Sequence, residues 1–311
     1  MGMKKDSVAL ALIGAASAAV YLIALARVFP LIRIYANPLL TIDTGVIDQG
    51  GVLSFAVGMA ALFTLYGLAC RIASRIGRSR RPLILFVAFA ALFAAVAVST
   101  YPIASTDAYG YLVFGRILER CHGNPLVIAT TLLSQDPLIA RAPWPDAPYL
   151  YGPLWAIVSG AVSFLAGDNI LFAMVLFKVL RLLAYLGTTI LIFHWMTKRG
   201  TYPPAAGTLF FAWNPLVIVE MMGNARDDGL VAILIVIVLA AYALVENRAR
   251  SGLVLAAAST LVKLTPAVLF PVFLVFIVRR SFSLRVGVRE CLAGTALAAL
   301  LVGALYAPFW A

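Results

Sequence analysis

The chain has 311 residues, of which 63% are hydrophobic and only 12% are charged, and its mean hydropathy is +0.99. A soluble domain of this length would carry roughly twice that share of charged residues, which excludes an ordinary soluble protein. The net charge of +11 does not indicate nucleic-acid binding, because the basic residues cluster between apolar runs, where the topology signals of membrane proteins lie.

The apolar residues come in long runs, and several of these approach the ~20 residues that cross a hydrocarbon core as a helix. The sequence therefore predicts an all-α polytopic membrane helix bundle that forms a single domain over residues 1–311. Two N-terminal helices are expected in 1–81, a core in 82–278 and a last helix in 279–311. About nine membrane segments are expected, at residues 8–28, 52–70, 82–104, 153–167, 170–196, 203–221, 229–245, 252–278 and 291–309.

Basic residues orient the first three of these segments. Lys4 and Lys5 precede the first segment, and five arginines between residues 71 and 81 separate the second from the third. The positive-inside rule assigns both clusters to the cytoplasm. The third segment then leads outward, so the loop of residues 105–150 is expected on the non-cytoplasmic side.

Two later segments leave the topology open. Segment 153–167 has 15 residues, or about 22 Å as a helix against about 30 Å of hydrocarbon, and segment 252–278 carries Lys263 and Pro266 at its middle. If both are half-crossings, all later basic clusters lie inside and residues 222–228 lie outside. If both cross fully, residues 222–228 face the cytoplasm.

The outer loop opens with an acid among aromatic side chains. A helix beginning near Ser105 would place Asp107, Tyr111 and Phe114 on one face, and Arg116 and Arg120 on another. Aromatic rings stack on sugars, arginines bind phosphate in a fork geometry, and a carboxylate can act as a general base. The alternative is that Ser105 or Asp107 only caps an interfacial helix, and that the arginines only anchor it at the interface.

Polar residues gather in three further stretches. In APYLYGPLW, Tyr151 sits where the chain re-enters the membrane, and on composition alone an aromatic belt is the better explanation. In WNPLVIVEMMGNARDDGL, ionisable groups at membrane depth indicate a polar pocket, although a cap of the next helix would explain the paired acids. In LVKLTPAVLFP, a lysine far from either segment end needs a polar partner. The candidate binding residues here are Tyr151, Glu220, Asn224, Asp227, Asp228 and Lys263.

The four stretches STDAYGYLVFGR, PYLYGPLW, NPLVIVEMMGNARDDGLVA and LVKLTPAVLFP occur in this order. Together they resemble the polyprenol-phosphate-mannose-dependent mannosyltransferases of actinobacterial lipoglycan synthesis, within the GT-C superfamily of membrane glycosyltransferases. The resemblance implies transfer of a sugar, most simply mannose, from a polyprenyl-phosphate donor to a hydroxyl of a glycan or glycolipid acceptor, with inversion. It implies a catalytic acid in the first outer loop of the core, where Asp107 stands. It also implies a multi-pass plasma-membrane protein whose active site faces outward.

The resemblance has two departures. Typical members are considerably longer, so we expect either a compact relative or a fragment without part of the acceptor side. Some GT-C enzymes use a pair of acids that holds a divalent cation, but Ala108 and Tyr109 follow Asp107. No cofactor is therefore expected, and a divalent cation is left open. Two other functions stay as alternatives, a membrane transporter or lipid flippase and a non-catalytic scaffold.

Overall fold

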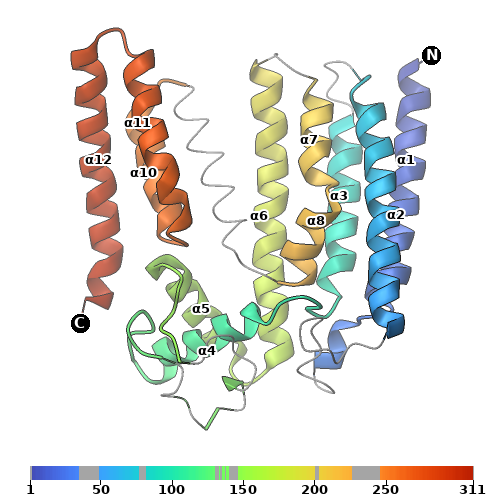
Figure 1. Ribbon diagram of the computed structural model, residues 1–311, viewed down its shortest axis with the longest axis horizontal. Coiled ribbons are helices and arrows are strands. Elements are labelled where there is room, and N and C mark those ends of the chain that lie inside the picture. Colours follow the sequence, from blue (N-terminus) through green and yellow to red (C-terminus); the bar gives the residue numbers. More distant parts are fainter. Residues whose placement is uncertain are drawn as a thin grey trace. The chain divides into compact units, whose positions relative to one another are not determined.

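The computed structural model describes residues 2–34, 49–76, 82–129, 133, 135–136, 138–139, 146–199, 203–225 and 246–310 (Figure 1). These residues form helices and contain no strand, which confirms the all-α prediction for this part of the chain. Four of the described helices are long and apolar enough to cross a membrane, or five if one bent helix pair is a single span. The protein is therefore a membrane protein, but the expected count of nine segments is not confirmed. The segment expected at 229–245 lies outside the described residues.

The chain divides into two compact units. Unit 1 contains residues 1–108 and 169–227, and unit 2 contains residues 109–168 and 228–311. Helix α4 (Asp107–Arg120) contains the point where the chain passes from the first unit to the second.

Unit 1 is a bundle built on five long or paired helices. They are α1 (Gly2–Val20) with its extension η1 (Tyr21–Ala26), α2 (Gln49–Ala73), α3 (Pro82–Val98), α6 (Ile170–Arg199), and α7 (Pro204–Ala212) with α8 (Pro215–Ile218) and η6 (Val219–Gly223). A short 3₁₀ turn, η2 (Leu31–Ile34), follows η1. The α7–α8 pair bends by 43° where Pro215 interrupts the helix. At this bend Trp213 packs edge-on against Phe86, Phe89 and Phe93 of α3, with ring centroids 5.4 to 6.0 Å apart.

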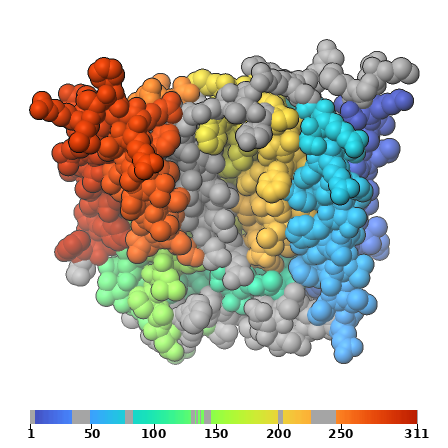
Figure 2. Space-filling view, turned by 45° about the horizontal axis from the view of Figure 1, so that its top comes forward, coloured from blue at the N-terminus to red at the C-terminus, as the bar shows by residue number. Residues whose placement is uncertain are grey.

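Unit 2 contains a helical hairpin where the sequence predicted the segment 252–278. Its arms are α10 (Ala249–Thr260) and α11 (Leu269–Arg280), joined by η7 (Thr265–Val268), and α12 (Leu284–Tyr306) with η8 (Ala307–Phe309) packs beside them. Leu253 near the start of α10 packs with Ile277 near the end of α11, so the two arms are antiparallel (Figure 1). Atoms of α10, α11 and α12, coloured orange to red, form one continuous body in Figure 2.

The arms of this hairpin are too short to cross a bilayer. Each has 12 residues, or about 18 Å as an α-helix, against about 30 Å of hydrocarbon. Because the arms are antiparallel, the start of α10 and the end of α11 lie at one end of the hairpin, and Lys263 lies at the other end, its tip. Of the two topologies that the sequence left open, this arrangement favours the one in which segment 252–278 is a half-crossing.

Helix α5 (Pro153–Ala166) begins against the hairpin tip. The backbone N–H groups of Gly152 and Leu154 donate to the carbonyls of Val262 and Leu261, at 2.8 and 3.0 Å. N–H groups at the start of α5, which have no partner within that helix, thus bind carbonyls that follow the end of α10 and also lack a helical partner. The approach is close, because a Cβ at Gly152 would lie 2.1 Å from the Leu261 oxygen.

We predict that Gly152→Ala lowers the free energy of unfolding by about 3 kcal/mol, through a backbone clash and two weakened hydrogen bonds. Gly187→Ala in α6 is the matched control, since its added methyl group meets no atom within 4 Å. Urea or thermal unfolding in detergent measures both variants. Equal stability of the two variants would contradict the close docking of α5 on the tip.

Candidate active site

Asp107 lies in the first turn of α4 and is partly exposed. The hydroxyl of Ser105 accepts a hydrogen bond from the backbone N–H of Asp107, at 3.2 Å. Ser105 thus supplies the side-chain cap, one of the two capping roles that the sequence left open. The Asp107 carboxylate is not needed for this bond, and its negative charge is favourable at a helix N-terminus.

Asn224 holds the backbone that leads into α4. Its side-chain oxygen accepts hydrogen bonds from the N–H groups of Ile103 and Ala104, both at 3.0 Å. The side chain is fully buried, at 0% exposure, at the end of η6. Two residues that the sequence selected independently, Asn224 and Asp107, are therefore linked within unit 1 through four residues of backbone.

Lys178 of α6 provides a second anchor, which sequence reasoning missed. Its amine is fully buried and donates to the carbonyls of Thr100 and Gly223, at 2.5 and 2.8 Å. The Thr100 carbonyl follows the end of α3 and the Gly223 carbonyl ends η6, so one amine binds carbonyls at the ends of two helices. One signal was present in the sequence, because Lys178 and Arg181 interrupt the middle of an apolar run, and ionisable groups there are usually functional.

Three further candidates come from the stretch WNPLVIVEMMGNARDDGL. Glu220 lies in η6 and is half-buried, and one of its carboxylate oxygens is buried without a hydrogen bond from a described residue. Asp227 and Asp228 lie outside the described residues.

Unit 2 brings together three residues selected from separate motifs. The hydroxyls of Tyr111 and Tyr151 are 3.0 Å apart, and the amine of Lys263 lies 5.3 Å from the centre of the Tyr151 ring. Tyr149 and Trp155 pack edge-on against Tyr111, with ring centroids 6.5 and 5.6 Å away. We call these five side chains the tyrosine–lysine cluster. Tyr111, Tyr149 and Trp155 are buried. The cluster therefore presents only the partly exposed Tyr151 ring and the amine of Lys263 that this ring stabilises.

Arg116 and Arg120 are bound to carboxylates of unit 2. Arg116 is 4% exposed and pairs with Asp136 at 2.5 Å, and Arg120 pairs with Asp168 at 2.9 Å. The hydrogen bond from Arg120, and then its positive charge, lower the pKa of Asp168 below its usual value. Arg116 therefore holds the loop between α4 and α5, whereas Arg120 holds the turn between α5 and α6. Each arginine shares its charge with an acid.

The described residues contain no group of three or more His, Cys, Asp and Glu side chains that could hold a metal ion. Asp227 and Asp228 do not belong to these residues.

The sequence also matches a known family. Residues 7–279 match the family described as alpha-(1->6)-mannopyranosyltransferase, N-terminal domain. The chain belongs to this family. The four sequence motifs resembled a family of mannosyltransferases, and this match confirms that prediction.

Two curated relatives of this mannosyltransferase-family chain carry the name alpha-(1->6)-mannopyranosyltransferase A. The protein of Mycobacterium tuberculosis is 30% identical over 216 residues, which are 66% of this chain and 40% of the relative. The protein of Corynebacterium glutamicum is 26% identical over 184 residues, which are 58% of this chain and 36% of the relative. The chain thus spans about two fifths of the length of these relatives. No solved structure matches it significantly.

Proposed function

We propose that this mannosyltransferase-family chain transfers mannose from a polyprenyl-phosphate donor to a hydroxyl of a glycan or glycolipid, at the non-cytoplasmic face of the plasma membrane. The family match supports the transferase class. The observation that carries the assignment of the site is the position of Asp107. It begins the helix that also carries Tyr111 of the tyrosine–lysine cluster, and two buried anchors hold the backbone before it.

In the proposed reaction the Asp107 carboxylate takes the proton from the acceptor hydroxyl. The acceptor oxygen forms a bond to C1 of mannose while the bond from C1 to the phosphate oxygen breaks, and polyprenyl phosphate leaves. Attack opposite to the leaving group inverts C1, so an alpha product requires a beta-linked donor. General-base catalysis of this kind contributes about 10²- to 10⁴-fold.

Charge that develops on the departing phosphate needs a cation beside it. We assign this role first to Lys263, because it lies at the hairpin tip over Tyr151. The partly exposed ring of Tyr151 is assigned to the donor sugar, and the buried Tyr111 holds it through the hydrogen bond between their hydroxyls. Arg116 and Arg120 can add to phosphate binding only if they exchange a carboxylate partner for it, since both are ion-paired. For Glu220, Asp227 and Asp228, contact with the acceptor or donor stays a proposal. The buried Asn224 is assigned a positioning role, because it binds the backbone before Asp107.

The function is tested by incubating the purified protein in lipid vesicles with polyprenyl-phosphate-mannose or a nucleotide-linked mannose, and a mannoside acceptor. We expect a product only from the lipid-linked donor, with the anomeric configuration opposite to that donor. Lys263→Gln is expected to raise the KM for the donor about tenfold or to lower kcat. A product formed from the nucleotide sugar alone would overturn the proposal.

A transporter or lipid flippase is the second candidate, because transporters often contain broken helices near the membrane midplane. The α10–α11 hairpin and the 43° bend between α7 and α8 are features of this kind. Movement of a lipid-linked sugar across vesicles without any new glycosidic bond would favour this function over mannosyl transfer.

A further inference from the structure

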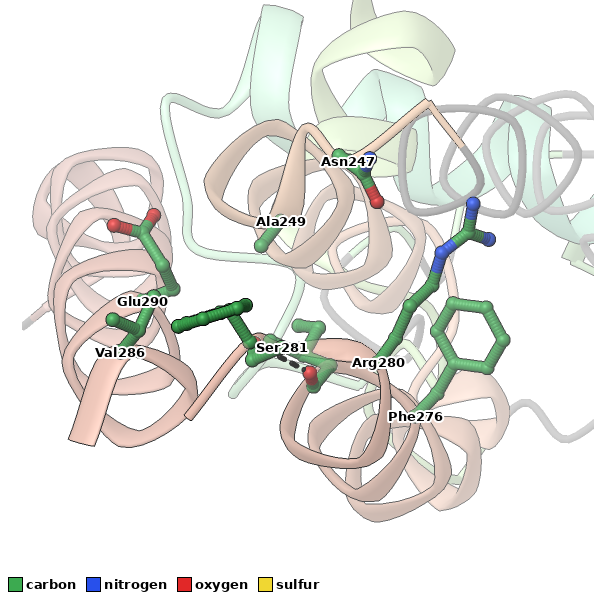
Figure 3. A pocket seen from close by; sticks show the side chains of 9 residues that line it. Asn247, Ala249, Phe276, Arg280, Ser281, Val286 and Glu290 are labelled. Atoms are coloured by element: carbon green, nitrogen blue, oxygen red, sulfur yellow. Dashed lines mark hydrogen bonds between the residues drawn. The ribbon is translucent and has the colours of Figure 1, made fainter. Parts of the chain in front are cut away.

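The base of the α10–α11 hairpin contains a cavity that the proposed reaction does not use. Its volume is about 340 Å³, and its walls come from α10, α11 and α12. Figure 3 shows Arg280, Phe276 and Ser281 of the α11 end facing Asn247 and Ala249, with Val286 and Glu290 on α12. All of these residues belong to unit 2, and the cavity lies at the opposite end of the hairpin from Lys263.

Arg280 and Glu290 are the charged residues that line this cavity, and the segments that carry them are rich in basic residues. Two acids, Glu246 and Glu290, face an excess of basic residues at the hairpin base and the start of α12, which are Arg248, Arg250, Arg279, Arg280, Arg285 and Arg289. Glu290 is already neutralised by Arg250, which binds both of its oxygens, at 2.8 and 2.9 Å. Arg280 instead lies over the ring of Phe276, with its guanidinium carbon 5.8 Å from the ring centre. The cavity therefore has an exposed guanidinium in the wall formed by α11 and a compensated ion pair in the wall formed by α12.

Apolar side chains project next to these arginines. Phe282 in the turn between α11 and α12 is fully exposed, and Leu284 at the start of α12 is 68% exposed. Leu284 also begins a helix long and apolar enough to span the membrane, so this turn lies at a membrane surface. A cavity with mostly apolar walls and one arginine, at a membrane surface and bordered by exposed apolar residues, has the chemistry of a phospholipid site. The headgroup would lie at the arginine and the chains along the helices.

We propose that this cavity binds the headgroup of an anionic phospholipid, with Arg280 on its phosphate and Phe282 and Leu284 against its acyl chains. By the positive-inside rule this lipid belongs to the cytoplasmic leaflet. The proposal does not depend on mannosyl transfer, since it concerns the other end of the hairpin. A bound lipid would join α10, α11 and α12 at their common end.

The test uses the full chain in detergent, titrated with phosphatidylglycerol, phosphatidylcholine or inorganic phosphate, with native mass spectrometry to count bound lipid. We expect preferential retention of phosphatidylglycerol over phosphatidylcholine. Arg280→Gln is expected to weaken that binding about fivefold, the effect of one basic residue at an anionic membrane surface. The control Arg71→Gln removes an exposed arginine from the end of α2, and it should leave the binding unchanged.

A second variant separates a true cavity site from diffuse attraction to a basic surface. Ala249→Leu fills part of the cavity without changing any charge, and it should also weaken phosphatidylglycerol binding. The proposal would be overturned if phosphatidylglycerol and phosphatidylcholine bound equally, or if Ala249→Leu bound phosphatidylglycerol as the wild type does. It would also be overturned if Arg71→Gln lost as much phosphatidylglycerol binding as Arg280→Gln. Binding of inorganic phosphate without any retention of phosphatidylglycerol would likewise overturn it.

Discussion

Asp107→Asn is expected to lower kcat for mannosyl transfer by about 10²- to 10⁴-fold, the usual contribution of a positioned general base. The amide has the size of the carboxylate but does not accept the acceptor proton. Folding should survive, because the capping hydrogen bond at this helix start uses the Ser105 hydroxyl and the backbone of residue 107. Initial rates with polyprenyl-phosphate-mannose, and the unfolding midpoint in detergent, measure the two effects separately.

The matched control is Asp146→Asn, which makes the same change at an exposed acid of the same outer loop. It should keep wild-type kcat. Asp107→Glu keeps a carboxylate but shifts it by one methylene group, so it should recover part of the lost rate. Wild-type turnover by Asp107→Asn would remove this residue from the role of base, whatever the outcome for the function as a whole.

Much of this site could be predicted because its parts are local. A run without charged residues followed by Ser105 and Asp107 predicts a helix start, and α4 begins there. The mid-segment lysine and proline raised a half-crossing as one of two topologies, and Lys263 lies between α10 and η7. Tyr111, Tyr151 and Lys263 come from three motifs, and their meeting depends on the docking of α5 against the hairpin tip, which no spacing in the sequence reveals.

Other features could not be predicted because they depend on tertiary partners. Arg116 and Arg120 have the spacing of a phosphate clamp, but Asp136 and Asp168 lie beside them in the folded chain. A close carboxylate competes with any phosphate for the same N–H donors. Lys178 has no neighbouring motif, and its partners are backbone carbonyls, which every sequence contains. Only the fold shows which two helix ends it joins.

Lys178→Met is expected to have the second-largest effect on stability and rate, because it removes the hydrogen bonds that hold the backbone before Asp107. Methionine has nearly the same length and fits a buried position, but it donates no hydrogen bond. The carbonyls of Thr100 and Gly223 would lose a donor, at about 1–3 kcal/mol for each buried group left unsatisfied. We expect the free energy of unfolding to fall by about 2–6 kcal/mol, and kcat to fall at least tenfold, since a 1 Å misplacement can cost about 100-fold.

A loss of stability alone would not show that Lys178 positions Asp107, so the decisive measurement is the rate of the folded fraction. If Lys178 acts through Asp107, kcat should fall while the KM for the donor changes less than about threefold. Lys198→Met, at an exposed site near the end of the same helix, is the control and should change neither quantity.

The double variant Asp107→Asn with Lys178→Met separates a positioning role of Lys178 from a purely structural one. In a protein that already carries Asp107→Asn, Lys178→Met should lower kcat little further, because the base that it positions no longer works. Effects of residues that act as a unit are strongly non-additive in this way. If the two losses multiply instead, Lys178 affects the rate by another route and its role is structural. Asn224→Leu should behave as Lys178→Met does, since both side chains hold residues 100–104 in place before the same carboxylate.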